Sequence, residues 1–219
     1  MKYDYFFTTT KFDKKVFKVR AKLYNKLIPK DIESLLEIGV GNGYMLFYCW
    51  GAVRYLGLEE NQKNAYFFRD NNCCTKDNNV ICRKAPEFLE HIRDKFDIIF
   101  TEHLVEHFKD YGEMQQFLRS CKQLLEPGGK IILLYPDIEK IKEVFWHDYT
   151  HSFITTKKRI EDILYDEGYE IVKSKRYWLC FIGVLSYITV LFKPFMWLLP
   201  HSIKLNLLQH SLTIARIKE

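Results

Sequence analysis

Three titratable side chains that lie close together in the sequence could carry out acid–base chemistry. His103, Glu106 and His107 have i, i+3, i+4 spacing, which on a helix would place them on one face. A later Asp-Tyr-Thr-His segment ends at His151 and adds a further imidazole. Imidazole changes its charge near neutral pH, and a carboxylate can fix its tautomer, so such a cluster can take a proton from a reacting group. We therefore predict catalytic roles for His103, Glu106, His107 and His151.

The segment from His103 to His107 also matches HxxEH, a zinc-binding pattern of one metallopeptidase class. A zinc peptidase is therefore an alternative function. It is weakened by a glycine-rich segment elsewhere in the chain, because a peptidase would leave that segment without a role.

That glycine-rich segment follows a short apolar run, 34–38, which has the character of a buried parallel strand. Gly39, Gly41 and Gly43 have the spacing GxGxG. Glycines at such a turn let the backbone approach a ligand closely, and a following helix presents its free N–H groups there. A dinucleotide-binding turn requires GxGxxG instead. Counted from Gly39, the last glycine of that pattern falls at Tyr44, so the pattern is not met.

Two acidic residues stand at the ends of predicted neighbouring strands. Glu37 is near the end of the first strand, and Glu59 ends the second, 20 residues after Gly39. An acid at the second position can accept hydrogen bonds from both ribose hydroxyls of a nucleoside. The glycines and Glu59 together predict a site for a ligand that contains a nucleoside.

These segments resemble the motifs of the class I S-adenosylmethionine-dependent methyltransferases. Residues 37–43 match the family's first motif, (D/E)xGxGxG, and residues 57–59 match the GxD/E end of its second strand. Residues 96–107 are similar to FDxIxxxEVLEH, and residues 125–130 are similar to the LxPGG turn. The resemblance covers the chain from about 20 to 217.

The resemblance implies that S-adenosylmethionine is the cofactor. Glu37 would lie near its amino group, the glycines would underlie its methionine portion, and Glu59 would bind the ribose. Two residues depart from the family pattern: Lys84 replaces a frequent acid, which leaves adenine recognition to the backbone at Ala85, and His103 replaces the first Glu of EVLEH. The implied cofactor-binding residues are Glu37, Gly39, Gly41, Gly43, Glu59, Ala85 and Thr101.

Among methyltransferases, the sequence resembles most those of bacterial surface-polysaccharide clusters, many of which carry a DxTH segment and an apolar insertion. This implies O-methylation of a sugar, a nucleotide-linked sugar or a phosphorylated glycan precursor of the cell envelope. Methylation of a quinone or lipid headgroup is an alternative, as is a binding module without catalysis. The arrangement is also similar to small-RNA 2′-O-methyltransferases, which implies a divalent metal ion as an optional cofactor and leaves its ligands open.

The elements that must position these residues alternate between strand and helix, which specifies a parallel sheet. We predict an α/β, Rossmann-like methyltransferase fold with a mostly parallel seven-stranded sheet and helices on both faces. Strands are expected over 34–38, 53–58, 79–83, 96–100, 130–135, 169–175 and 211–217, and helices over 11–28, 44–50, 61–70, 86–93, 113–125 and 155–166.

The length of 219 residues suits a single methyltransferase domain, 1–219, with an N-terminal helix over 11–28. An apolar helical insertion is expected over 178–208, before the last strand. Its apolar run, 180–192, is shorter than the ~20 residues that span a bilayer. The insertion could cap the acceptor site, form a homodimer interface or bind the membrane surface peripherally.

Composition narrows the remaining choices. The net charge of +5 comes from dispersed Lys and Arg, so no nucleic-acid partner is expected and the partner is a small-molecule or glycan acceptor. The six cysteines form no CxxC pair, and the N-terminus does not resemble a secretory signal. We expect a cytoplasmic protein, with the inner face of the membrane as an alternative location.

Overall fold

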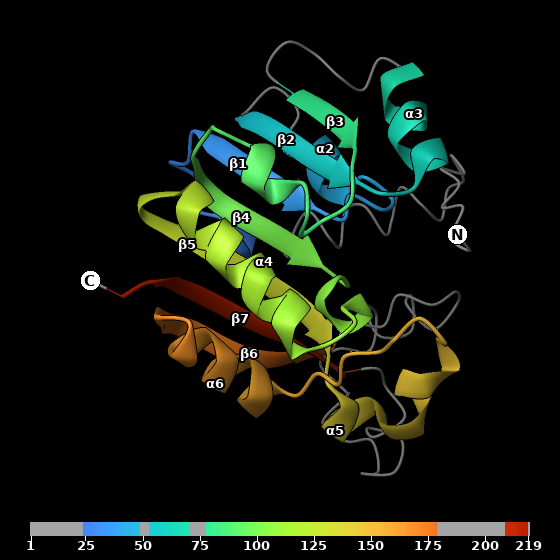
Figure 1. Cartoon of the computed structure of the whole chain (residues 1–219). Coiled ribbons are helices and arrows are strands. Elements are labelled where there is room, and N and C mark those ends of the chain that lie inside the picture. The colour runs from blue at the N-terminus through green and yellow to red at the C-terminus, as the bar shows by residue number, and fades with distance from the viewer. Residues whose placement is uncertain (1–23, 49–52, 71–77, 179–208, 219) are drawn as a thin grey trace.

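The computed structural model describes residues 24–48, 53–70, 78–178 and 209–218. Its strands are β1 (Ser34–Ile38), β2 (Arg54–Glu59), β3 (Asn78–Cys82), β4 (Phe96–Glu102), β5 (Leu125–Pro136), β6 (Tyr169–Trp178) and β7 (Gln209–Ile217). Within these ranges they form one sheet in the order β3-β2-β1-β4-β5-β7-β6 (Figure 1). Strands β1 to β5 pair in parallel, whereas β7 runs antiparallel to both β5 and β6. The predicted mostly parallel, seven-stranded α/β fold is confirmed.

The helices lie between the strands, as the alternating pattern predicted. They are α2 (Tyr44–Tyr48), α3 (Gln62–Asp70), α4 (Tyr111–Leu124), α5 (Ile138–Ile141) and α6 (Lys157–Asp166), with 3-10 helices η1 (Leu89–His91), η2 (Val105–His107) and η3 (Lys142–His147). The longer helices begin at side-chain caps: the Asp110 carboxylate accepts from Glu113 N at α4, and the Thr156 hydroxyl accepts from Arg159 N at α6. Of the predicted helix over 11–28, the described part is helical over 24–27.

The sheet separates two apolar cores. In β5, Ile131 and Leu133 belong to the core on one face, and Ile132 and Leu134 belong to the core on the other. Helices α4 and α6 pack on the first face and lie in front of the sheet in Figure 1, while α2 and α3 bury side chains in the second core. Successive side chains of a strand point to opposite faces, and both faces of β5 are covered. The residues of β5 from Ile131 to Tyr135 are therefore all buried, which explains its continuous apolar run.

One predicted helix is wrong. Over 86–93 the chain forms only a turn and the short η1, and Leu89 is the one fully buried apolar side chain between Glu87 and Arg93. Phe88, Leu89 and Ile92 still pack against the core. A segment of this length has little helical stability of its own, so its conformation is set by that packing. Conversely, α5 and η3 were not predicted, and they carry the chain from β5 to the segment around His151.

The predicted insertion over 178–208 lies outside the described residues, apart from Trp178 at the end of β6. Trp178 pairs with Gln209 at the start of β7, so the insertion leaves and rejoins the sheet at neighbouring positions. Among the helices of the described residues, none is long and apolar enough to cross a membrane.

Candidate active site

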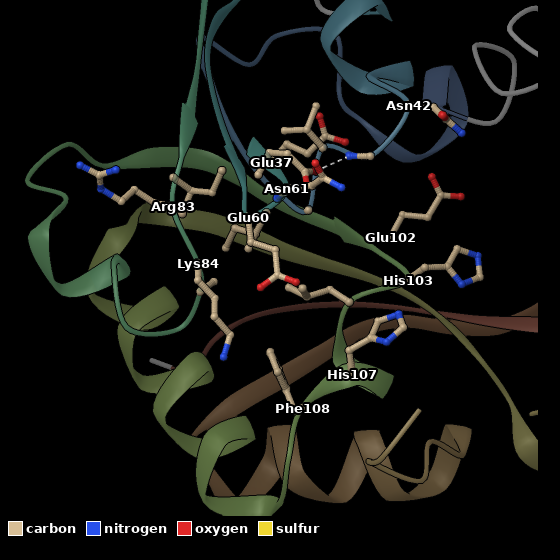
Figure 2. Close-up of a pocket in the computed structure, with 18 of the residues that line it drawn as sticks. Glu37, Asn42, Glu60, Asn61, Arg83, Lys84, Glu102, His103, His107 and Phe108 are labelled. Atoms are coloured by element: carbon tan, nitrogen blue, oxygen red, sulfur yellow. Dashed lines mark hydrogen bonds between the residues drawn. The ribbon is translucent and has the colours of Figure 1, made fainter. Parts of the chain in front are cut away.

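A pocket of about 530 Å³ opens at the carboxyl ends of β1, β2 and β4, where parallel α/β sheets hold their ligands. The turn after β1, residues 59–61 after β2 and the segment after β4 all contribute to its wall. In Figure 2, Glu102, His103 and His107 lie toward one side of the pocket, and Arg83 and Lys84 lie toward the other. The pocket therefore offers two chemically different ends.

The turn after β1 has the conformation that its glycines allow. Gly39, Gly41 and Gly43 have φ values of 84°, 52° and 71°, a region that disfavours residues with a side chain. Gly39 N donates to Leu58 O at 2.9 Å, which ties the turn to β2. A Cβ at Gly41 would meet no atom within 4 Å, so the backbone there faces open space that a ligand can fill. Gly39 and Gly41 line the pocket, whereas Gly43 lies outside its wall.

Glu59 is held rigidly in the pocket wall. Glu59 is only 6% exposed. Its two carboxylate oxygens accept hydrogen bonds from Gly41 N and Asn61 N, each at 2.8 Å. Burial raises the pKa of Glu59 above its ordinary value, and the hydrogen bonds from Asn61 and Gly41 oppose that shift. Each carboxylate oxygen has a second lone pair, so the group can also accept hydrogen bonds from ribose hydroxyls.

The other predicted cofactor residues differ in placement. Glu37 lines the pocket, is buried, and accepts a hydrogen bond from the Tyr55 hydroxyl. Ala85 lines the pocket beside Lys84. Thr101 is buried in β4 and does not line the pocket, and its Oγ1 has no hydrogen-bond partner among the described residues.

The expected helical face of His103, Glu106 and His107 is wrong, because no α-helix forms there. His103 has a φ of 57°, outside the helical region, and η2 starts only at Val105. The backbone turns at His103 because its N–H donates to Leu134 O of β5 at 2.8 Å and so continues the sheet pairing.

This turn nevertheless brings His103 and Glu106 together. His103 Nδ1 lies 3.0 Å from Glu106 Oε1, and the Glu106 side chain is fully buried. Burial by itself would raise the pKa of Glu106, but the hydrogen bond and charge of His103 outweigh it, and the pKa of Glu106 is lowered. Glu106 therefore anchors the His103 ring from behind the pocket wall.

His107 and His151 form a second pair. Their ring centroids are 4.9 Å apart. His107 Nδ1 lies 2.9 Å from Thr150 Oγ1, and His151 Nδ1 lies 2.7 Å from the carbonyl oxygen of Phe145. All three sequence-predicted histidines are thus anchored through Nδ1.

The sequence interpretation missed several residues of this region. Thr150 and Tyr149 line the pocket and belong to the segment that ends at His151, so that motif was the signal for them. His210 packs edge-on against His103 with ring centroids 4.6 Å apart. It comes from β7, and no sequence pattern connects it to the site. His103 and His107 line the pocket, whereas Glu106 and His151 lie behind its wall.

Three of these residues have the donor set of a metal site. Ligand atoms of Glu106, His107 and His151 lie within 4.8 Å of one another, and Glu106 Oε2 is buried without a hydrogen-bond partner among the described residues. Two imidazoles and a carboxylate suit a divalent transition-metal ion. His103 is outside this group, so the arrangement differs from the HxxEH zinc pattern, in which both histidines bind the ion.

Residues 12–174 match the family model described as a methyltransferase domain. No match to a curated protein was found. Among solved structures, a SAM dependent methyltransferase from Archaeoglobus fulgidus is similar at 21% identity and a TM-score of 0.64, with 91% of this chain and 93% of that chain covered. N-methyltransferase NodS from Bradyrhizobium japonicum, in complex with S-adenosyl-L-homocysteine, is similar at 12% identity and a TM-score of 0.61, with 100% and 94% covered.

A putative methyltransferase from Bacillus halodurans is similar at 15% identity and a TM-score of 0.62, with 91% and 98% of the two chains covered. At these identities the structural likeness shows the fold, while the family match spans most of the chain. The open space at Gly41 and the buried carboxylate of Glu59 fit a nucleoside cofactor. The chain therefore belongs to the methyltransferase domain family, and it is an S-adenosylmethionine-dependent methyltransferase.

Proposed function

We propose that this enzyme methylates a hydroxyl group of a sugar, a nucleotide-linked sugar or a phosphorylated glycan precursor. The observation that carries the proposal is that His103 and His107 line the same pocket as the glycine turn and Glu59. Histidine suits a hydroxyl acceptor, which must lose its proton as it is methylated.

We assign the residues that the sequence implied to the parts of the cofactor. Glu59 would hold the ribose, the turn with Gly39 and Gly41 would face the methionine portion, and Glu37 would lie near the amino group. The carboxylates of Glu37, Glu59 and Glu102 in the pocket wall favour a ligand that carries positive charge. S-adenosylmethionine, when bound, supplies a methyl group activated by a positively charged sulfur.

The protein's task at the other end is to align the acceptor and receive its proton. When bound, the cofactor would supply its methyl group to the acceptor oxygen, and the sulfur would keep the electron pair of its broken bond to that carbon. The hydroxyl proton passes to Nε2 of His107 or His103. Glu106 would orient His103, and His151 would support His107 from behind the wall.

An exposed aromatic ring in the pocket wall supports a ring-shaped acceptor. Tyr149 is 66% exposed and lines the pocket. The apolar face of a sugar ring can pack against such side chains. A quinone ring would also suit such a side chain.

Mass spectrometry of methyl transfer from isotopically labelled S-adenosylmethionine tests the proposal. The panel contains nucleotide-linked sugars, phosphorylated glycan intermediates, quinones and lipid headgroup analogues. We expect transfer to an oxygen of a sugar-containing acceptor. Transfer only to a quinone or lipid headgroup would overturn the acceptor class, and transfer to nitrogen would overturn the reaction type.

A divalent metal ion is a second candidate for the acceptor side, supported by the grouping of Glu106, His107 and His151. If the metal ion is bound, His107 is one of its ligands, and His103 is the histidine in the pocket wall that can still receive the acceptor proton. Such an ion would polarise the acceptor hydroxyl. Turnover that is lost after dialysis against a chelator and restored by Mg²⁺, Mn²⁺ or Zn²⁺ would establish this version, whereas unchanged turnover would exclude it.

We propose further that residues 178–208 cap the acceptor side, with peripheral membrane contact or homodimer formation as alternatives, in a cytoplasmic enzyme. The pairing of Trp178 with Gln209 supports the cap, because the β6 and β7 ends where the segment attaches lie close to His103 through His210.

A further inference from the structure

We infer that Asp148 and Thr150 are positioning residues, which hold His107 as the tautomer with its proton on Nδ1 and its Nε2 lone pair available to the pocket. The inference deepens the proposed function, because it gives His107 the form that a proton acceptor needs. The tautomer itself is a property of the folded chain and can be measured without any acceptor.

The single proton of the Thr150 hydroxyl determines where the proton of His107 lies. Thr150 Oγ1 donates to Asp148 Oδ1 at 2.7 Å. A hydroxyl has only one proton, so Thr150 Oγ1 can only accept in its other contact. That contact is His107 Nδ1 at 2.9 Å, and His107 Nδ1 must therefore carry the proton.

The reverse arrangement is excluded by the carboxylate. If Thr150 donated to His107 Nδ1, then Thr150 Oγ1 would lie 2.7 Å from Asp148 Oδ1 with no proton between two acceptor oxygens. Such a contact is repulsive, because an ionised carboxylate accepts but does not donate. Asp148 thus fixes the tautomer of His107 through Thr150.

The backbone around Asp148 is fixed as well. Asp148 Oδ1 also accepts from Thr150 N at 3.0 Å, and Asp148 O accepts from His151 N at 3.2 Å. Ser152 N and Phe153 N both donate to Glu106 O, next to His107 in the chain, at 2.9 and 3.1 Å. These bonds dock the whole segment on η2, so the distance from Thr150 to His107 is set by backbone contacts.

His107 is part of the pocket wall. Both His107 and Thr150 line the pocket, and among the described residues no hydrogen bond to His107 Nε2 is found. In the neutral imidazole with its proton on Nδ1, Nε2 has a lone pair. A proton acceptor needs that lone pair, and a wrong tautomer in the serine-protease triad lowers turnover severely.

The test is a long-range ¹H–¹⁵N correlation spectrum of the histidine rings of the full chain, without acceptor, with His107 assigned from the His107→Ala spectrum. We expect His107 of the wild type to be the Nδ1–H tautomer. Thr150→Val should shift His107 toward the Nε2–H form, because Nδ1 loses its acceptor, and Thr150→Ser should restore the wild-type signal. Ser152→Ala, which removes an exposed hydroxyl of the same segment, should change nothing.

Turnover provides the second readout. Thr150→Val and Asp148→Ala should lower kcat by roughly 10- to 100-fold, the range for residues that orient a functional histidine, with the KM for S-adenosylmethionine unchanged. An Nε2–H tautomer in the wild type, or an unchanged tautomer in Thr150→Val, would overturn the inference. If the wild type has the Nδ1–H tautomer but His107→Ala keeps full turnover, the role of His107 in the proposed function would be overturned and the inference would stand. The two failures are therefore distinguishable.

Discussion

At the residue scale, Glu59 is hydrogen-bonded to the glycine turn in the wall of the pocket. It accepts a hydrogen bond from Gly41 N and has lone pairs left for the ribose. The sequence identified Glu59 from its place at the end of β2. Its burial and its bond to Gly41 are tertiary features, and they make the carboxylate part of the turn.

Glu59→Ala should weaken the affinity for S-adenosylmethionine by about 1.5 to 3 kcal/mol, which is the usual loss for a charged hydrogen-bond acceptor. The measurement is calorimetric titration of the cofactor. Glu143→Ala, an exposed acid in η3, is the matched control and should bind like the wild type. Equal affinity in the Glu59 and Glu143 variants would contradict the ribose assignment.

His107→Ala or His103→Ala should lower turnover by ~10² to 10⁴, the usual contribution of general-base assistance. Affinity for the cofactor should stay nearly the same, because neither residue belongs to the glycine turn or contacts Glu59 in the structure. His147→Ala, at an exposed histidine, is the control for removing an imidazole. Near-wild-type turnover in both single variants and in the double variant would show that alignment alone drives the reaction.

At the element scale, the turn between β1 and α2 depends on close packing with β2. A Cβ at Gly57 would lie 2.6 Å from Val40 Cγ2 and 2.9 Å from the Tyr55 hydroxyl oxygen. Val40 is part of the turn, and Tyr55 donates to Glu37. A small residue in the middle of β2 is therefore required by the site.

Gly57→Ala should destabilise the protein by about 1 to 3 kcal/mol, as overpacking of a filled core does. The added methyl group also displaces Val40, so affinity for the cofactor should fall more than stability alone explains. Thermal unfolding with and without S-adenosylmethionine measures both effects. Gly112→Ala at the start of α4 is the control: its Cβ meets only the Asp110 carboxylate, and alanine favours a helix.

At the scale of the whole molecule, a buried acid joins the strands beside the site. Asp137 is fully buried after β5, and its Oδ2 accepts from Arg176 Nε of β6 at 2.8 Å and from Ser211 Oγ of β7 at 3.0 Å. It also caps α5 by accepting from Glu139 N. This group connects the antiparallel strands to the parallel part of the sheet.

Asp137→Ala should lower the free energy of unfolding by about 1.5 to 3 kcal/mol, because charge-assisted hydrogen bonds are lost and Arg176 keeps only its bond to Glu139. Urea denaturation measures the change. Glu170→Ala removes the exposed pair with Arg216 and should cost at most ~1 kcal/mol. A loss of similar size in both variants would contradict a special role for Asp137.

Replacement of residues 179–208 by a short Asn-Gly turn should leave the fold and the cofactor affinity intact, because Trp178 and Gln209 are cross-strand partners that a hairpin turn can join. Methyl transfer to the acceptor should be lost if the segment caps that side. Flotation with anionic liposomes at low salt compares the full chain with the variant. Full transfer by the variant would contradict the cap, and a full chain that stays unbound would exclude membrane association.

The sequence by itself determined the fold class, and it selected the residues that we assign to the cofactor. Short apolar runs that form buried strands, glycines that need positive φ and an acid at a strand end are local requirements, so Gly39, Gly41 and Glu59 could be identified from their neighbours in the chain. The segment after β4 was predicted to be catalytic from the types and spacing of His103, Glu106 and His107, which are also local features of the sequence.

Only the tertiary structure decided how the histidines are arranged. Sheet pairing with β5 turns the backbone at His103 and prevents the expected helix, which periodicity within one segment cannot show. Thr150, which contacts His107, lies 43 positions further along the chain, and Asp148 accepts a hydrogen bond from Thr150. Both reach His107 because the backbone N–H groups of residues 152 and 153 donate to Glu106 O. Contacts between distant segments set the tautomer and neighbours of each ring, and these do not follow from the order of residues.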